Sequence, residues 1–155
     1  MTVICTDGVT VASDSLTTFG DERGLRPSQK IMVKGGRIYA ASGVMILPEL
    51  VAWHIAGADP RKLPVTGGRE EWSMLVFAPS QINFYHSDVP YPLRIDPPFA
   101  LGSAGDFALG AIDHGASPEQ AVAIAMRRSI KCGGPIQVVN IAEALGLQTV
   151  KEAAE

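Results

Sequence analysis

The first forty residues contain four short runs rich in apolar and β-branched side chains, separated by polar and glycine-containing segments, which indicates strands. Two β-branched runs, Thr2–Thr6 and Val9–Ser13, flank an Asp-Gly dipeptide, which favours the two-residue turn of a hairpin. A second pair of runs, Lys30–Val33 and Arg37–Ala41, flanks a Lys-Gly-Gly turn whose glycines can adopt positive φ. We therefore predict two hairpins, separated by a long connection over residues 15–29 that has no sustained period.

The central part of the chain changes to helical spacing and then returns to strands. Leu47, Leu50, Val51 and Ile55 recur at the spacing of one helix face, which predicts a helix over residues 44–56. A loop follows, then two apolar runs across a short turn, then a segment whose four prolines suit only irregular chain or an edge strand. These segments are the loop 57–70, the strand pair Trp72–Phe77 and Ile82–Tyr85, and the stretch 87–98.

Two consecutive helices and a final strand are predicted for the last third of the chain. A helix over residues 106–114 ends at a glycine, and Ser117 followed by Pro is a typical start for a second helix that runs to about residue 130. We expect its inner face to consist of Ala121, Ile124, Ala125 and Ile130. A strand over 136–140 and a short helix from Ala142 complete an α+β layered fold. No repeat or linker divides the sequence, so we expect one domain spanning residues 1–155.

Composition and charge narrow the classes of function. Of the 155 residues, 46% are hydrophobic and 19% are charged, as in a globular protein that buries a core. The net charge is −3, with 13 Lys and Arg and no basic stripe, so we expect no nucleic-acid partner. No apolar stretch reaches the ~20 residues that span a bilayer, so we expect no membrane association. The sparse cysteines and the lack of a leader-like segment lead us to expect a cytoplasmic protein.

The side chains that most often hold metal ions are scattered along the chain. Three histidines and two cysteines have no ligand-like spacing, so we expect no metal site and no cofactor. These residues are His54, His86, His114, Cys5 and Cys132.

The N-terminus carries the candidate chemistry. Removal of Met1, which a small second residue permits, would leave Thr2 with a free α-amine. Such a residue combines nucleophile and general base, because its hydroxyl attacks while its own amine accepts the proton. An α-amine titrates at about pH 7.7–8.0, so much of it is neutral near neutral pH. Many chains begin with Met-Thr by chance, so the feature needs support from the residues that follow.

Four motifs provide that support through their order and spacing. Gly8–Ser15 reads Gly-Val-Thr-Val-Ala-Ser-Asp-Ser, and Lys30 follows Asp14 by sixteen residues. Tyr39–Gly43 ends in small residues and a glycine, and Ala100–Leu109 contains Gly-Ser-Ala-Gly before a predicted helix. Together with the early threonine, this pattern resembles the N-terminal nucleophile hydrolases of the proteasome β-subunit and HslV peptidase family, over most of the chain.

The resemblance implies a fold and a set of roles. The fold would be a four-layer αββα sandwich of the N-terminal nucleophile hydrolase type. Lys30 would lower the pKa of the Thr2 amine by like-charge repulsion, and Asp14 would keep Lys30 charged and oriented. The Gly43 backbone N–H would bind the oxyanion, and Ser103 would support the N-terminus by hydrogen bonding. From the residues alone, an ordinary surface ion pair and a simple strand-end turn at Gly43 stay open as alternatives.

The resemblance also implies a substrate and an assembly. Pocket walls in this family come from the second hairpin and the adjoining helix, here Thr18, Met32 and Met45. Met45 would favour medium apolar side chains at the cleaved position. A threonine endopeptidase of this kind cleaves peptides or unfolded protein inside a homo-oligomeric ring, which can stack as a double ring. The family resemblance further implies an ATP-dependent unfoldase as partner.

One departure from the family pattern keeps two other functions open. Proteasome-type enzymes carry an acid just after the last long helix, whereas residues 128–135 contain none, and Ser129 is the nearest polar substitute. A catalytically silent ring or scaffold subunit on the same fold is therefore one alternative. An N-terminal nucleophile amidohydrolase acting on a small amide is the other, although such enzymes usually begin with Cys or Ser and carry larger insertions.

Overall fold

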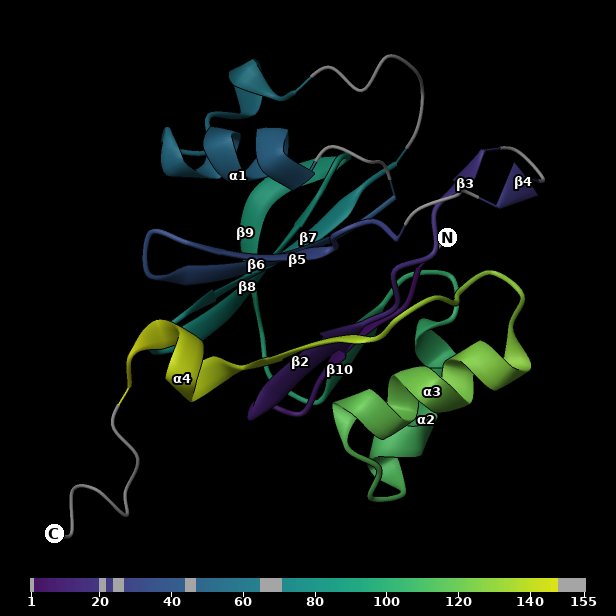
Figure 1. The fold of residues 1–155 in the computed structure, drawn as a ribbon. Helices are drawn as coiled ribbons and strands as arrows, with labels where there is room; N and C mark the ends of the chain where they lie inside the picture. The colour runs from purple at the N-terminus through teal and green to yellow at the C-terminus, as the bar shows by residue number, and fades with distance from the viewer. Residues whose placement is uncertain (1, 20–21, 24–26, 44–46, 65–70, 148–155) are drawn as a thin grey trace, which may run out of the picture.

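The computed structural model describes residues 2–19, 22–23, 27–43, 47–64 and 71–147. They form an α+β structure with two larger antiparallel sheets and a two-stranded ribbon (Figure 1). The four-stranded sheet has the order β10-β1-β2-β11, and the five-stranded sheet runs from β5 to β9 in chain order. The strands are β1 (Ile4–Thr6), β2 (Thr10–Ser13), β3 (Thr18–Phe19), β4 (Glu22–Arg23), β5 (Ile31–Lys34), β6 (Arg37–Ser42), β7 (Ser73–Ala78), β8 (Gln81–His86), β9 (Val89–Ile95), β10 (Phe99–Leu101) and β11 (Gln137–Asn140). The helices are α1 (Leu47–Ile55), the 3-10 helix η1 (Pro60–Lys62), α2 (Gly105–Asp113), α3 (Pro118–Arg128) and α4 (Ile141–Leu145).

The first hairpin forms as predicted, and its turn explains why. Asp7 Oδ1 accepts hydrogen bonds from the backbone N–H groups of Val9, at 2.9 Å, and Thr10, at 3.0 Å. Gly8 adopts φ +91°, a conformation that side chains rarely tolerate. The predicted hairpins β5–β6 and β7–β8 are also confirmed.

Alternation along β1 sorts its side chains between two cores. Ile4 lies between the two large sheets, where it packs with Ile38 and Leu75 of the five-stranded sheet. Its neighbours Val3 and Cys5 face the opposite way and pack against α2 and α3. The same hairpin is therefore buried on both faces.

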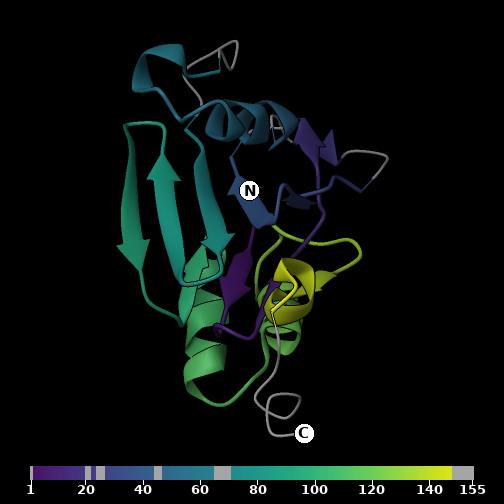
Figure 2. The same ribbon diagram turned by 90° about the vertical axis from the view of Figure 1, so that its left-hand side faces the viewer.

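The five-stranded sheet is sorted in the same manner. Tyr39 and Met74 face α1, where they pack with Leu50 and Trp53. Figures 1 and 2 show α1 on the side of this sheet that faces away from the four-stranded sheet, with α2 and α3 at the other end of the molecule. Each fully buried Leu or Met side chain contributes about 1.5–3 kcal/mol to stability, so both helix-covered faces and the space between the sheets hold the structure together.

Three local expectations are corrected by the structure. Residues 99–101 form β10, which pairs with β1, where no strand was expected. The connection 15–29 contains the short strands β3 and β4. Helix α3 ends at Arg128, so Ile130 does not belong to its inner face and is 85% exposed, while Val122 is buried there instead. The other ends agree within a few residues; of the helix predicted at 44–56, residues 44–46 lie outside the described part.

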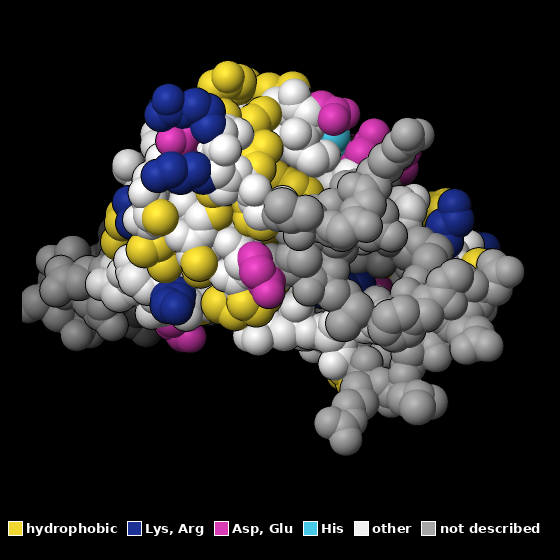
Figure 3. Space-filling view, turned by 90° about the horizontal axis from the view of Figure 1, so that it is seen from above, with side chains coloured by type: hydrophobic (Ala, Val, Ile, Leu, Met, Phe, Trp, Pro, Cys, Tyr) yellow, Lys and Arg dark blue, Asp and Glu magenta, His cyan; other side chains and the backbone are white. Residues whose placement is uncertain are grey.

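The face of the molecule on the α1 side carries side chains of mixed character (Figure 3). Viewed from the α1 side, Lys and Arg side chains stand in separate groups with hydrophobic and uncharged side chains between them (Figure 3). Among the described helices, none is long and apolar enough to cross a membrane.

Candidate active site

The hairpin register brings Asp14 to the start of the chain. Ile4 pairs with Ser13 in the β1–β2 ladder, so the next residues along, Val3 and Asp14, lie opposite each other. Two hydrogen bonds join them: Val3 N–H donates to Asp14 Oδ1 at 3.1 Å, and Asp14 N–H donates to the Val3 carbonyl at 3.2 Å. The carboxylate that directly follows β2 is thereby fixed beside Thr2.

Lys30 completes a buried cluster with these two residues. Its Nζ lies 2.8 Å from Thr2 Oγ1 and 2.9 Å from Asp14 Oδ1. Thr2 is 3% exposed, Asp14 0% and Lys30 7%. An exposed surface ion pair, the alternative that the sequence left open, is therefore wrong for Asp14 and Lys30.

Burial and charge act against each other on Lys30. Removal from water lowers the pKa of the Lys30 ammonium, while the charge and hydrogen bond of Asp14 raise it. Burial is the larger effect, so the pKa of Lys30 lies below its usual value. The nearby Cys132 thiol is also buried, and burial raises its pKa, which keeps it neutral near pH 7. Asp14 is therefore the counter-charge that partly offsets the effect of burial on Lys30.

The second oxygen of Asp14 is held by the loop that follows α3. Oδ2 accepts hydrogen bonds from Gly133 N–H at 3.0 Å and Leu16 N–H at 3.3 Å. The same loop is fastened through Ser15, whose Oγ donates to the Pro135 carbonyl at 2.6 Å. No side chain in residues 128–135 is acidic, and this loop bonds Asp14 through the backbone N–H of Gly133.

The Gly-Ser-Ala-Gly segment lies against the first described residue of the chain. Thr2 N is 3.4 Å from Ser103 Oγ, and Ala104 N–H donates to the Thr2 carbonyl at 3.3 Å. Gly102 adopts φ +96°, and a Cβ at this position would overlap the Thr2 carbonyl oxygen. The structure thus brings Ser103 next to Thr2, where the resemblance implied it, and explains the glycine before it.

Gly43 follows the end of β6 and is exposed. It adopts φ +114°, and a Cβ there would run into the backbone of Glu71 and Trp72. Two residues earlier, Ala41 N–H donates to the Lys30 carbonyl at 3.0 Å, so the end of β6 is bonded to the segment that carries the lysine. A glycine is therefore required here by its backbone conformation and by packing.

The predicted pocket residues are only partly described. Thr18 belongs to β3, and Met32 in β5 packs against the core beneath α1. Met45 lies outside the described residues. The proposed substrate pocket therefore stays a prediction.

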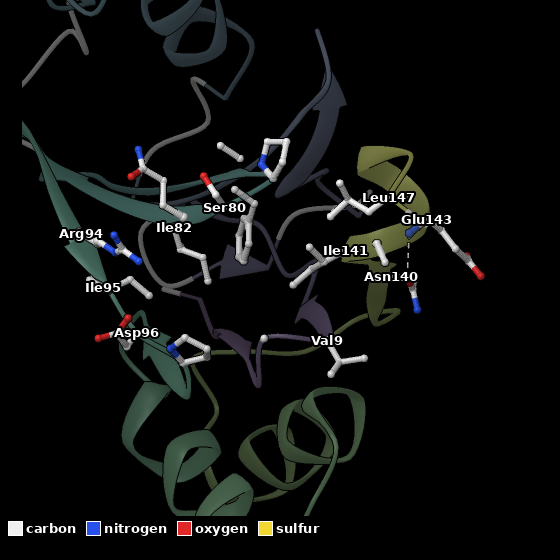
Figure 4. A pocket seen from close by; sticks show the side chains of 17 residues that line it. Val9, Ser80, Ile82, Arg94, Ile95, Asp96, Asn140, Ile141, Glu143 and Leu147 are labelled. Atoms are coloured by element: carbon white, nitrogen blue, oxygen red, sulfur yellow. Dashed lines mark hydrogen bonds between the residues drawn. The ribbon is translucent and has the colours of Figure 1, made fainter. Parts of the chain in front are cut away.

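A cavity of about 570 Å³ opens at the other end of the first hairpin from Thr2 (Figure 4). It is lined by the β1–β2 turn, the β7–β8 turn, the end of β9 and α4, and Val9, Ile82, Arg94 and Ile141 are among its residues. None of the predicted site residues lines it. Among the described residues, no three His, Cys, Asp or Glu side chains form a group that could hold a metal ion.

No family model and no curated protein matches the chain. Solved structures do. BPH from Thiobacillus denitrificans superposes with a TM-score of 0.64 at 17% identity, over 90% of this chain and 97% of that one. The same protein in complex with epoxomicin gives 0.63 at 17%, over 90% and 98%.

A eukaryotic HslV from Trypanosoma brucei gives a TM-score of 0.62 at 16% identity, over 90% of this chain and 98% of that one. The chain therefore has the fold of the N-terminal nucleophile hydrolases of the proteasome β-subunit and HslV type. The resemblance drawn from the sequence motifs is confirmed at the level of the fold.

Proposed function

We propose that this chain is a threonine-type endopeptidase subunit whose nucleophile is Thr2 after removal of Met1. One observation carries the proposal: the buried Lys30 ammonium lies 2.8 Å from Thr2 Oγ1 while Asp14 holds it at 2.9 Å. Burying a lysine ammonium costs free energy of folding. A catalytic role explains why one lies against the hydroxyl of Thr2 despite this cost. We further propose that the fold is a four-layer αββα sandwich formed by one domain over residues 1–155.

The proposed reaction is acyl transfer through Thr2. Its hydroxyl oxygen attacks the peptide carbonyl while its α-amine accepts the proton, and that proton then passes to the leaving amine. Lys30 disfavours protonation of the amine by like-charge repulsion and stabilises the developing alkoxide. The Gly43 N–H donates to the oxyanion, and Ser103 orients the N-terminus. Water then hydrolyses the ester on Thr2 to free the enzyme.

The assembly and setting belong to the same proposal. We infer a cytoplasmic homo-oligomeric ring, single or stacked as a double ring, that encloses its active sites. An ATP-dependent unfoldase would deliver peptides or unfolded protein, and Thr18, Met32 and Met45 would line the substrate pocket. The fold likeness to HslV supports this assembly.

A catalytically silent ring or scaffold subunit is the second candidate, and one observation favours it. The residues after α3 provide no acid, and Ser129, the nearest polar substitute, accepts a hydrogen bond from Lys131 N–H at 3.1 Å. A small-amide amidohydrolase has no comparable support, because the chain begins with neither Cys nor Ser after Met1.

Intact-mass measurement combined with peptide hydrolysis tests the proposal. The peptidase requires loss of one methionine and cleavage of a fluorogenic peptide by the purified protein. Thr2→Ala should abolish cleavage while leaving the fold intact, since it removes one hydroxyl and one methyl near the end of the chain. Retention of Met1 together with no cleavage would favour the silent scaffold.

A further inference from the structure

The main chain at Lys30 is held from two directions. Lys30 precedes β5, so its N–H lies outside the strand ladder of the five-stranded sheet. Its carbonyl accepts from Ala41 N–H of β6 at 3.0 Å, and its own N–H donates to Gln137 Oε1 at 3.0 Å. Gln137 is the first residue of β11, at the edge of the four-stranded sheet. The main chain of Lys30 is thus bonded to one sheet by backbone and to the other by the Gln137 side chain.

The Gln137 amide uses both of its ends in this link. Its Nε2 donates to the Ser28 carbonyl at 2.8 Å, so the amide is hydrogen-bonded to the main chain on both sides of Gln29. Its Oε1 also lies 3.4 Å from Ser13 Oγ, and Ser13 is the residue opposite Gln137 in the β2–β11 ladder. Since Asp14 follows Ser13 directly, the strand pair that carries the carboxylate also anchors the lysine.

We infer that Gln137 is a positioning residue that sets the reach of Lys30 Nζ to Thr2 Oγ1. The inference rests on the proposed function of Thr2 and extends it to a residue that acts through the main chain of Lys30. A lysine ammonium sits on a flexible four-carbon stem, so its placement depends on a fixed main chain at its base. Small misplacement of a reacting group can cost about 100-fold in rate.

The test compares Gln137→Met with Asn140→Ala. Methionine has a similar volume, but it has no N–H to donate to the Ser28 carbonyl, and its thioether sulfur is only a weak acceptor for Lys30 N–H. Asn140, at the other end of β11, caps α4 by accepting from Glu143 N–H at 3.0 Å, so its replacement perturbs the same strand far from Lys30. For each variant we would measure the pH profile of hydrolysis of a fluorogenic peptide with leucine at the cleaved position, and determine a crystal structure.

We expect Gln137→Met to lower kcat by about 10- to 100-fold with little change in KM. The acidic limb of its pH profile should move to higher pH, because a displaced Lys30 no longer lowers the pKa of the Thr2 amine. Its crystal structure should show Lys30 Nζ beyond hydrogen-bond distance of Thr2 Oγ1, and Asn140→Ala should show neither change. The inference would be overturned if the acidic limb of the Gln137→Met pH profile matched that of the wild type and Lys30 Nζ stayed within hydrogen-bond distance of Thr2 Oγ1.

Two further readouts keep the test decisive. If Gln137→Met does not fold, Gln137→Asn keeps an amide but is one methylene too short to reach Lys30 N–H, and it should produce the same changes. If the wild-type protein hydrolyses nothing, the proposed function fails. The position of Lys30 in the variant structure still decides whether Gln137 positions it.

Discussion

Asp14 is the residue on which the geometry of the candidate site depends. Its two carboxylate oxygens accept four hydrogen bonds, from Val3, Lys30, Leu16 and Gly133, which belong to different segments of the chain. A charge removed from water is tolerated only when its bonding capacity is satisfied in this way. The same carboxylate therefore joins the first strand, the lysine segment and the loop after α3.

Lys30→Ala tests the catalytic role of the ammonium. It should lower peptide hydrolysis by about 10²–10⁴-fold, because the cation beside the Thr2 amine and hydroxyl is lost. The assay is hydrolysis of a fluorogenic peptide by protein whose fold is checked by circular dichroism. Lys34→Ala, which changes an exposed lysine on β5, is the matched control and should be fully active. Equal rates for wild type and Lys30→Ala would show that the proposed site is wrong.

Asp14→Ala tests the structural cost of the buried pair. Removing the carboxylate leaves the Lys30 ammonium buried without its counter-charge, and such changes destabilise proteins by about 3–5 kcal/mol. Urea unfolding measures the free-energy difference. Asp59→Ala, which breaks an exposed pair with Arg61, should have a much smaller effect. If Asp14→Ala lowers the free energy of unfolding no more than Asp59→Ala does, the buried pair does not stabilise the protein.

At the scale of elements, local patterns predicted the hairpins and helices, whereas pairings set by distant residues were missed. The Asp-Gly and Gly-Gly turns and the helix start at Ser117, which is followed by Pro, are local signals, and the structure confirms the elements they predict. Strand β10 exists because it pairs with β1, ninety-odd positions earlier in the chain, a contact that no local pattern reveals. Ile130 was misplaced because the helix period was extended beyond the C-cap at Ser129.

Helix α1 carries a titratable contact with the sheet beneath it. His54 Nδ1 lies 2.9 Å from the Tyr39 hydroxyl, and burial and Arg37 lower the pKa of His54 below 6.5. Well above pH 6.5 the imidazole is neutral in the folded and unfolded states alike. As pH falls below 6.5 the unfolded state takes up the proton first, so the free energy of unfolding decreases.

His54→Gln replaces the imidazole by an amide that cannot be protonated. The substitution should weaken the dependence of the free energy of unfolding on pH. Urea unfolding at pH 7.5 and at pH 5 measures the loss of stability on acidification for each protein. We expect a larger loss for the wild type than for the variant. The same loss in both proteins would contradict the lowered pKa of His54.

At the scale of the whole molecule, the site forms where the ends of several segments meet. Thr2 precedes β1, Asp14 follows β2, Lys30 precedes β5 and Ser103 follows β10. The sequence motifs predicted these four residues and the structure brings them together; their catalytic roles stay predictions. Gly133 and Gln137 were missed because one acts through a backbone N–H and the other through an ordinary polar side chain, and neither has a spacing signature.

The proposed ring assembly can be tested by the mass of the native protein. Exposed apolar side chains, such as Tyr91 at 59% and Phe107 at 48%, are available for subunit contacts. The proposed function predicts a ring several times heavier than the 16.4 kDa chain. Analytical ultracentrifugation at micromolar concentration measures the mass. A protein that sediments only as a monomer would contradict the proposed ring peptidase, while the fold assignment would be unchanged.

Covalent capture of Thr2 tests the central claim most directly. A peptide epoxyketone reacts with a hydroxyl and a free α-amine on the same residue, so one adduct reports on the nucleophile and the base together. Mass spectrometry of the treated protein should show Thr2 as the first residue and carrying the adduct, and Thr2→Ala should carry none. A folded, assembled protein that retains Met1 and forms no adduct would contradict the account and identify a silent subunit.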